Sequence, residues 1–280
     1  MKQVAHCYLS PSGSTRKAGH KICSLLEKKG YATREFDLAW YRGKEPDVND
    51  VIRASSLLLV GSPVYANHAA EPVIALLSNI PGGSGKPALA YVTYGGVSKG
   101  SSLYELAEML VKKGYSVLGL AEVLAAHSMM FRDGHPVGIG HPGEDDWETL
   151  ASWVDELSPL LERGSGGTMD YAATRPPGML NRMLDATIFT PRFMRHFWPN
   201  IRFMPEKCTL CGVCRESCPV GRLDGLPQID SFAECLYCYQ CVRRCPEGAF
   251  DASMWITHPA IRLLSKVSRR HGGQATSFYT

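Results

Sequence analysis

Eight of the ten cysteines of this chain lie in two short motifs of identical spacing. The motif from Cys208 to Pro219 reads C-x2-C-x2-C-x3-C-P, and the motif from Cys235 to Pro246 repeats it. Gaps of two residues let three thiolates of one loop reach three irons of a cubane, while the fourth cysteine reaches the other cluster. Structural zinc is the alternative, but two C-x2-C pairs would already satisfy it. The motifs therefore predict two [4Fe–4S] clusters.

The crossing of the fourth cysteine assigns the ligands of each cluster. We expect cluster I to be held by Cys208, Cys211, Cys214 and Cys245. We expect cluster II to be held by Cys235, Cys238, Cys241 and Cys218. The segment resembles the bacterial two-cluster ferredoxins, an α+β fold, over about residues 200–255. The other two cysteines, Cys7 and Cys23, are expected to be buried free thiols.

A hydroxyl-rich loop, Ser10-Pro11-Ser12-Gly13-Ser14-Thr15, follows an apolar run and precedes a helical pattern. Backbone amides, hydroxyls and the helix dipole can hold a phosphate there without a fixed cation. Alternatively, Ser14 or Thr15 simply caps the helix. The loop has neither the lysine of GxxxxGK[ST] nor the spacing of GxGxxG, which disfavours ATP and NAD.

The first 164 residues alternate apolar runs with helical patterns, as repeated βα units do. We expect strands at Val4–Leu9, Tyr31–Asp37, Ser56–Gly61, Ala88–Tyr94 and Tyr115–Val123. We expect helices near Thr15–Lys29, Asp47–Ala54, Glu71–Asn79, Ser101–Lys113 and Asp146–Glu162. Right-handed crossovers then give a doubly wound α/β domain with a parallel sheet. The long loop at 125–143 carries His127, His135 and His141, which we expect to be solvated.

Two further loops open at the carboxyl edge of the predicted sheet, where such sheets bind ligands. They are Gly61–Tyr65 and Thr93–Gly96. With these residues the first domain resembles the flavodoxin-like family over residues 1–163. The resemblance implies a five-stranded sheet of order 2-1-3-4-5 and an FMN cofactor. Family loops often place a glycine near the flavin, and here Asn67, which tolerates positive φ, stands in that region.

The FMN contacts that the resemblance implies come from all three loops. The phosphate would be held by Ser10, Ser12, Gly13, Ser14 and Thr15. The flavin ring would lie between two loops, with contacts from Pro63, Val64, Tyr65, Asn67, Thr93, Tyr94, Gly95 and Gly96. Among these side chains, Tyr65 is the one that we expect to contact the ring.

Four segments are expected along the chain. Residues 1–163 form the FMN domain, residues 164–204 an aromatic linker, residues 205–253 the two-cluster domain, and residues 254–280 a basic helix and tail. The linker has Phe189, Phe193 and Phe197 at i, i+4 and i+8, so we expect residues 178–204 to dock the domains or to shield a redox centre. Pro259–Arg270 is expected to be a helix with basic residues at Arg262, Lys266, Arg269 and Arg270.

Composition excludes several classes of protein. The 280 residues are 45% hydrophobic and 20% charged, which excludes a disordered or fibrous chain. Residues 165–280 hold 14 Lys and Arg against 9 Asp and Glu, a net charge of +5 that two clusters of about −2 each would bring to +1, so we expect no nucleic-acid partner. We find neither an apolar run of about eighteen residues nor a secretory signal, and expect a cytoplasmic protein. Peripheral membrane contact by the C-terminal helix is the less favoured alternative.

As a whole the chain resembles the flavodoxin–ferredoxin fusion proteins. The resemblance implies an electron carrier of anaerobic metabolism that couples one- and two-electron carriers. Its partners would be a low-potential donor and an acceptor, both redox proteins. The alternative is a flavin-dependent reductase of a small-molecule acceptor that receives electrons through its clusters. A third, non-redox alternative makes the clusters structural.

Overall fold

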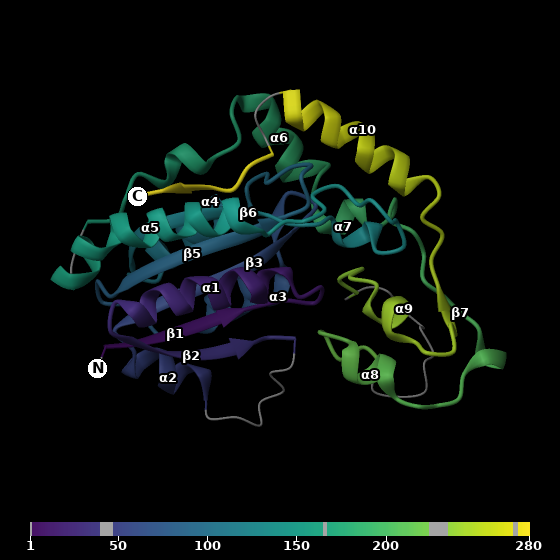
Figure 1. The fold of residues 1–280 in the computed structure, drawn as a ribbon, viewed down its shortest axis with the longest axis horizontal. Coiled ribbons are helices and arrows are strands. Elements are labelled where there is room, and N and C mark those ends of the chain that lie inside the picture. Colours follow the sequence, from purple (N-terminus) through teal and green to yellow (C-terminus); the bar gives the residue numbers. More distant parts are fainter. Residues whose placement is uncertain (1, 40–46, 165–166, 224–234, 271–273) are drawn as a thin grey trace.

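A computed structural model describes residues 2–39, 47–164, 167–223, 235–270 and 274–280. The fold is mixed α/β, with a mainly parallel sheet (Figure 1). Residues 165–166 of the expected domain boundary and residues 224–234 of the expected cluster domain lie outside the described residues.

The parallel strands are the frame on which the candidate site is built. They are β1 (Lys2–Tyr8), β2 (Tyr31–Asp37), β3 (Leu57–Tyr65), β5 (Pro87–Tyr94) and β6 (Ser116–Leu124). Along the sheet the order is β2-β1-β3-β5-β6-β9, and β4 (His68–Ala69) pairs with β3. The expected count of five strands is therefore too low, because β4 and β9 (Ser277–Tyr279) add antiparallel pairs to β3 and β6. Strands of two and three residues carry too little periodicity to be predicted.

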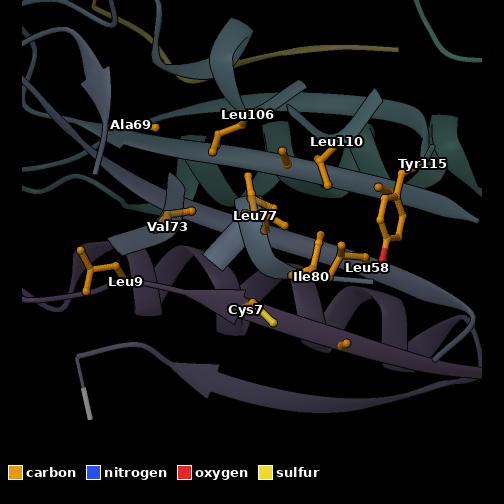
Figure 2. Close-up of a cluster of buried hydrophobic side chains, with 14 of the residues drawn as sticks. Cys7, Leu9, Leu58, Ala69, Val73, Leu77, Ile80, Leu106, Leu110 and Tyr115 are labelled. Atoms are coloured by element: carbon orange, nitrogen blue, oxygen red, sulfur yellow. The ribbon is translucent and has the colours of Figure 1, made fainter. Parts of the chain in front are cut away.

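Helices cover both faces of the sheet (Figure 1). One face packs against α1 (Ser14–Lys28) and α5 (Glu144–Arg163). The other packs against α2 (Val48–Ala54), α3 (Glu71–Asn79) and α4 (Ser102–Lys112). Figure 2 shows the core on this second face, where Leu77 and Leu110 meet side chains of the strands. The sheet is thus buried on both sides, as its unbroken apolar runs predict.

The spacing of the helices' apolar residues explains these faces. In α1, Ala18, Ile22 and Leu26 recur every four residues and are fully buried. Such a stripe holds a helix on a sheet through one face. As a result, the amino end of α1 lies at the carboxyl edge, next to the end of β1.

Gly19 lies at the closest approach of α1 to the sheet. A Cβ atom there would lie 2.2 Å from His6 Cε1 and 2.3 Å from Tyr91 Oη. Alanine in place of a helical glycine usually stabilises by about 0.5–1 kcal/mol. We expect Gly19→Ala instead to destabilise the protein by about 1–3 kcal/mol, because the added methyl group overpacks the core.

The thermal midpoint followed by far-UV circular dichroism measures this effect. Ser24→Ala, on the exposed face of the same helix, is the matched control and should melt like the unmodified protein. A Gly19→Ala protein that melts at or above the midpoint of the unmodified protein would contradict the packing described here.

The connection after α5 contacts both halves of the molecule. It contains η2 (Tyr171–Thr174), α6 (Met179–Thr187) and α7 (Pro191–Met194). Asp185 of α6 is buried and accepts hydrogen bonds from Asn67 Nδ2 (2.8 Å) and Ser101 Oγ (2.9 Å). Trp198 packs into the core of the cysteine-rich region, with its ring centroid 5.3 Å from that of Tyr237. This segment therefore has contacts with both regions.

The phenylalanine stripe of the connection is less buried than its spacing suggests. Phe189, Phe193 and Phe197 are 36%, 42% and 67% exposed. The reason is local, since α7 spans only Pro191–Met194 and the three rings do not share one continuous helix. The stripe is therefore not a closed core.

The cysteine-rich region is small. Its elements are β7 (Arg202–Phe203), η3 (Pro205–Lys207), α8 (Val213–Ser217), α9 (Gln240–Arg244) and β8 (Phe250–Asp251). β7 pairs antiparallel with β8, and α8 packs against α9. In Figure 1 these elements lie beyond the carboxyl end of β1.

The last helix, α10 (Thr257–Arg270), begins two residues before the expected start at Pro259. The chain then returns to the first domain as β9, which pairs antiparallel with β6. The C-terminal segment is therefore a helix followed by an edge strand of the main sheet, and not only a tail.

Candidate functional site: cysteine loops beside a phosphate-type loop

The eight motif cysteines fall into two groups in space. Cys208, Cys211, Cys214 and Cys245 together line one cavity of about 330 Å³. For the second group, burial raises the pKa of Cys241, and the charges of Cys238, Cys235 and Cys218 raise it further. Cys245 thus lies with the first three cysteines of the first motif, and Cys218 lies near those of the second. Four thiolate donors around each centre fit iron–sulfur ligation.

The two cysteine loops repeat the same backbone conformation. Leu210 and Tyr237, each just before the second cysteine of its motif, have φ of 57° and 51°. Gly212 and Tyr239, each just after that cysteine, have φ of 78° and 56°. Left-handed backbone is costly for residues other than glycine and clusters at functional sites. The repetition indicates that both loops are shaped for the same kind of ligand.

Backbone amides also point at cysteine sulfurs. Tyr237 N–H donates to Cys235 Sγ at 3.3 Å, and Ala249 N–H donates to Cys245 Sγ at 3.2 Å. Such bonds stabilise negative charge on a thiolate cluster and raise its reduction potential. Arg243 lies near Cys238 and Tyr65, and its guanidinium adds positive charge beside this group, although burial lowers its pKa.

The hydroxyl-rich loop lies between β1 and α1. Gly13, with φ of 91°, is the residue before the helix, and the first turn that follows is neutral or basic in sequence. The amides of Ser12, Ser14 and Thr15 have no hydrogen-bond partner among the described residues. Free amides at a helix amino terminus are the donors that a phosphate requires. The loop therefore fits a phosphate group.

Gly13 is the N-cap residue of α1 and has no side-chain hydrogen bond, but Ser10 bonds an amide of the first turn. Ser10 Oγ accepts a hydrogen bond from Arg16 N–H at 2.9 Å. The expectation that Ser14 or Thr15 acts as the cap is wrong, because Ser14 already begins the helix and Thr15 is bonded elsewhere. Thr15 Oγ1 lies 2.7 Å from Thr93 Oγ1, which ties the loop to the end of β5.

The other two predicted loops lie at the same edge, since β1, β3 and β5 are parallel neighbours. Pro63 and Thr93 are register partners at the ends of β3 and β5. The residues Ala66 and Asn67 form the turn from β3 to β4, with φ of 45° and 68°. Asn67 thus has the positive φ that was expected of it. All thirteen residues assigned to the FMN site come from these three loops.

Two of the residues assigned to the FMN site form hydrogen bonds with the C-terminal segment. Tyr94 is buried, and its hydroxyl donates to Ala275 O (2.8 Å) while accepting from Ala275 N–H (3.0 Å). Its side chain therefore holds the C-terminal segment. Gly96, with φ of 68°, offers its carbonyl to Gln274 Nε2 at 2.6 Å.

A cavity of about 900 Å³ opens beside the loops that end β3 and β5. Tyr65, Asn67 and Gly95 line one side of it, and Phe197 with Trp198 from the connection lines another. The helix α10 contributes further apolar side chains, Ile261 among them. The connection and α10 thus cover the carboxyl edge of the sheet.

Sequence reasoning missed His127 as a residue of this cavity. Burial and the nearby His258 lower its pKa to about 4, so the ring is neutral. It lies against Gly95, where a Cβ atom would come within 2.6 Å of its Cδ2. The expected solvation of the loop histidines holds for His135, which is exposed, whereas His141 contacts Asp146 at 2.7 Å. The contact between His127 and Gly95 has no signal in the sequence and is seen only in the structure.

The second cysteine loop contacts the first domain directly. Gln240 Nε2 donates to Pro11 O in the phosphate-type loop. Leu236 and Cys238 pack in the same apolar cluster as Val64 and Tyr65. The second cysteine group is therefore adjacent to the loops that are candidates for flavin binding, while Cys211 of the first group is exposed.

Residues 200–246 match a family described as a 4Fe-4S dicluster domain. The chain therefore contains an iron–sulfur domain, as its cysteine motifs predict. A comparison with curated proteins gave no match.

Among solved structures, the chain is similar to rubredoxin oxygen:oxidoreductase from the anaerobe Desulfovibrio gigas, at 19% identity and a TM-score of 0.47. It is similar to a flavodiiron core from Synechocystis, at 16% identity and a TM-score of 0.45. Each match covers 59% of this chain and 37% of the other. A flavodoxin from the domain Archaea is 19% identical, with 57% of this chain and 99% of that chain covered and a TM-score of 0.41. The chain thus spans little more than a third of the first two proteins.

A membrane-spanning segment is not found in the described part of the chain, because none of its helices is both long and apolar enough.

Proposed function

We propose that this chain is an electron-transfer flavo-iron–sulfur protein that relays electrons between two [4Fe–4S] clusters and FMN. A [4Fe–4S] cluster carries single electrons, whereas FMN accepts two and releases them one at a time, so together they couple one- and two-electron carriers. The observation that carries the proposal is the contact of the second cysteine loop with both Pro11 and Tyr65. It brings the proposed cluster and the proposed flavin site next to one another in one chain.

The proposed roles follow from the donor atoms present. Cluster I takes Cys208, Cys211, Cys214 and Cys245, and cluster II takes Cys235, Cys238, Cys241 and Cys218. The phosphate of FMN is bound by the loop from Ser10 to Thr15, whose unpaired amides supply the donors. The flavin ring lies between the ends of β3 and β5, with Tyr65 between it and cluster II. Arg243 supplies positive charge close to Cys238.

The segments act as one unit in this proposal. Residues 1–163 bind FMN, residues 164–204 dock the two halves, residues 205–253 bind the clusters, and residues 254–280 cover the site. A reducing cytoplasm suits such clusters. The partners are a low-potential redox protein as donor and a second redox protein as acceptor.

The basic face of α10 is the proposed aid to docking of an acidic donor. Two of its four basic residues already have partners, since Arg262 pairs with Asp133 at 2.5 Å and Arg269 donates to Gln274 at 3.0 Å. Lys266 and Arg270 are exposed and have no ion-pair partner among the described residues. Steering by such charges weakens as salt rises.

Cofactor analysis of anaerobically purified protein tests the proposal. We expect about eight irons, eight sulfides and one FMN per chain. The two cysteine motifs supply ligands for two [4Fe–4S] clusters, and the three loops at the carboxyl edge of the sheet form one FMN site. Chemical iron and sulfide assays and the visible spectrum measure this content. About four irons per chain or stoichiometric zinc in the motifs would contradict the two-cluster assignment, and a spectrum without flavin bands would contradict FMN.

A second candidate function is a flavin-dependent reductase of a small-molecule acceptor. The observation that favours it is the cavity of about 900 Å³ beside Tyr65 and Gly95, which exceeds what one small planar ring requires. Photoreduced protein that turns over a small oxidant without a second protein would support the reductase. Strict dependence on a protein acceptor would support the carrier.

A further inference from the structure

A separate group of potential metal ligands lies on the face of the sheet that packs against α1. It consists of His6 from β1, Cys23 from α1 and Glu35 from β2. One ligand atom from each lies within 4.8 Å of the other two. His6 Nδ1 is 3.3 Å from Cys23 Sγ and 3.8 Å from Glu35 Oε1. This group shares no residue with the cysteine motifs or the three flavin-binding loops.

Hydrogen bonds on the far side of the imidazole fix the tautomer of His6. Tyr91 donates its single hydroxyl hydrogen to Thr15 O at 3.0 Å. The contact of 2.9 Å between His6 Nε2 and Tyr91 Oη therefore requires Nε2 to carry a hydrogen. Burial lowers the pKa of His6 despite the opposing effect of Glu35, so the ring is neutral. Its Nδ1 lone pair consequently faces the thiol and the carboxylate.

The Oε2 atom of Glu35 has two side-chain partners. His20 Nε2 lies 2.9 Å from Glu35 Oε2, and Tyr8 donates to the same oxygen at 3.4 Å. Oε1 is the oxygen that faces His6. The Glu35 side chain is 28% exposed and His20 is 56% exposed, whereas His6 is fully buried. The group is therefore reached from solvent through its carboxylate side.

We propose that His6 Nδ1, Cys23 Sγ and Glu35 Oε1 form a zinc site with water in the fourth position. Imidazole, thiolate and carboxylate are the three protein ligands that zinc prefers. Zn–N and Zn–O bonds of about 2.0–2.2 Å and a Zn–S bond of about 2.3 Å place tetrahedral donors about 3.3–3.6 Å apart. The distances of 3.3 and 3.8 Å from His6 Nδ1 are close to this spacing.

Closing the site requires only small changes. Glu35 Oε1 moves toward His6 Nδ1 and Cys23 Sγ, because its 3.8 Å from His6 exceeds the tetrahedral spacing and the side chain is partly exposed. The thiol proton of Cys23 leaves for solvent as the Zn–S bond forms. Tyr91 remains bonded to His6 Nε2 and orients the ring, as partners of metal-bound histidines commonly do.

A zinc ion bound here would link β1, α1 and β2 to one another, close to the phosphate-type loop. The chain of contacts His6–Tyr91–Thr15 connects the zinc site with that loop. Zinc that binds only the folded chain stabilises it in proportion to its free concentration. Zinc at this site thus stabilises the fold, and this effect is independent of whether the carrier or the reductase function is correct.

The test uses full-length, anaerobically purified holoprotein with its clusters in place, incubated with one equivalent of Zn²⁺ and desalted. We expect one zinc per chain with the iron and sulfide content unchanged. Zinc K-edge X-ray absorption should show a single sulfur neighbour at about 2.3 Å and nitrogen or oxygen neighbours at about 2.0–2.2 Å. Zinc that is lost on desalting, or that has two or more sulfur neighbours, overturns the proposal.

Three variants separate this site from other thiols. Cys23→Ser should remove the sulfur neighbour and weaken zinc binding by more than about 100-fold. Loss of a ligand should cost more than loss of a ligand's hydrogen-bond partner, which typically costs about 10- to 100-fold in metal affinity. Glu35→Gln, at a partly exposed position, should weaken binding while the sulfur neighbour remains. Cys7→Ser is the matched control, because Cys7 is equally buried but packs on the opposite face of the sheet. Equal zinc affinity in Cys23→Ser and Cys7→Ser proteins would overturn the proposal.

Discussion

A Cys211→Ala protein is expected to lose rapid reduction of its flavin by an acidic, ferredoxin-like donor. Cys211 is the exposed cysteine of the first group, so the cluster proposed there is the one that we expect a donor protein to reach from solvent. The second group lies against Tyr65, so in the proposed relay its cluster comes after the first cluster and before FMN. Loss of one ligand should reduce the iron content from about eight toward about four per chain.

Stopped-flow absorbance at the flavin band measures this effect. Reduction by a small diffusible chemical reductant should remain largely intact, because it does not depend on the first cluster. Cys7→Ala, which changes a buried cysteine outside the motifs, is the matched control and should behave like the unmodified protein. If the Cys211→Ala protein accepts electrons from the donor protein at the normal rate, the flavin is its own entry point and the proposed relay order is wrong.

The second large effect is expected at the phosphate-type loop. Ser12→Ala and Thr15→Ala should each weaken FMN binding by roughly 1.5–3 kcal/mol, since each removes a hydroxyl donor to a charged phosphate. This corresponds to about 10- to 100-fold in the dissociation constant. Thr15→Ala should also lower stability by about 1 kcal/mol, because Thr93 Oγ1 loses its partner, whereas Ser12→Ala should not.

Flavin fluorescence quenching on titration of apoprotein with FMN gives the dissociation constants. The visible spectrum of the clusters should be unchanged in both variants. Ser24→Ala, at an exposed position on the same helix, controls for the loss of a hydroxyl group. Normal FMN affinity in both loop variants would show that the loop only begins a helix.

The elements of the fold that could be predicted from sequence are those marked by a long pattern of residues. Long apolar runs such as Leu57–Val60 and the four-residue spacing in α1 have one favourable arrangement, so strands and helices of the first domain could be predicted. The cysteine spacing likewise predicts that the first three thiolates of each motif lie close together, because a two-residue gap allows few loop conformations.

Other features depend on distant residues and could not be predicted. The hydroxyl that bonds an amide of the first turn of α1 comes from Ser10, four residues before the helix begins, because Gly13 lets the chain turn back. Asp185 carries no motif, and its role arises only when α6 packs against Asn67. Likewise His6, Cys23 and Glu35 are separated by helix and strand, so their convergence follows from the register of β1 and β2.

Strand β9 determines when folding of the main sheet can finish. Ser277 pairs with Glu122, 155 residues earlier, and the whole cysteine-rich region lies between them in sequence. The ribosome must therefore release the cysteine-rich region before the open edge of β6 can be covered. Contacts between residues so far apart in sequence form late in folding, since a long loop must close first. Until then β6 exposes an unpaired edge, a known route to aggregation, which makes timely folding of the cluster domain a condition for protecting the sheet.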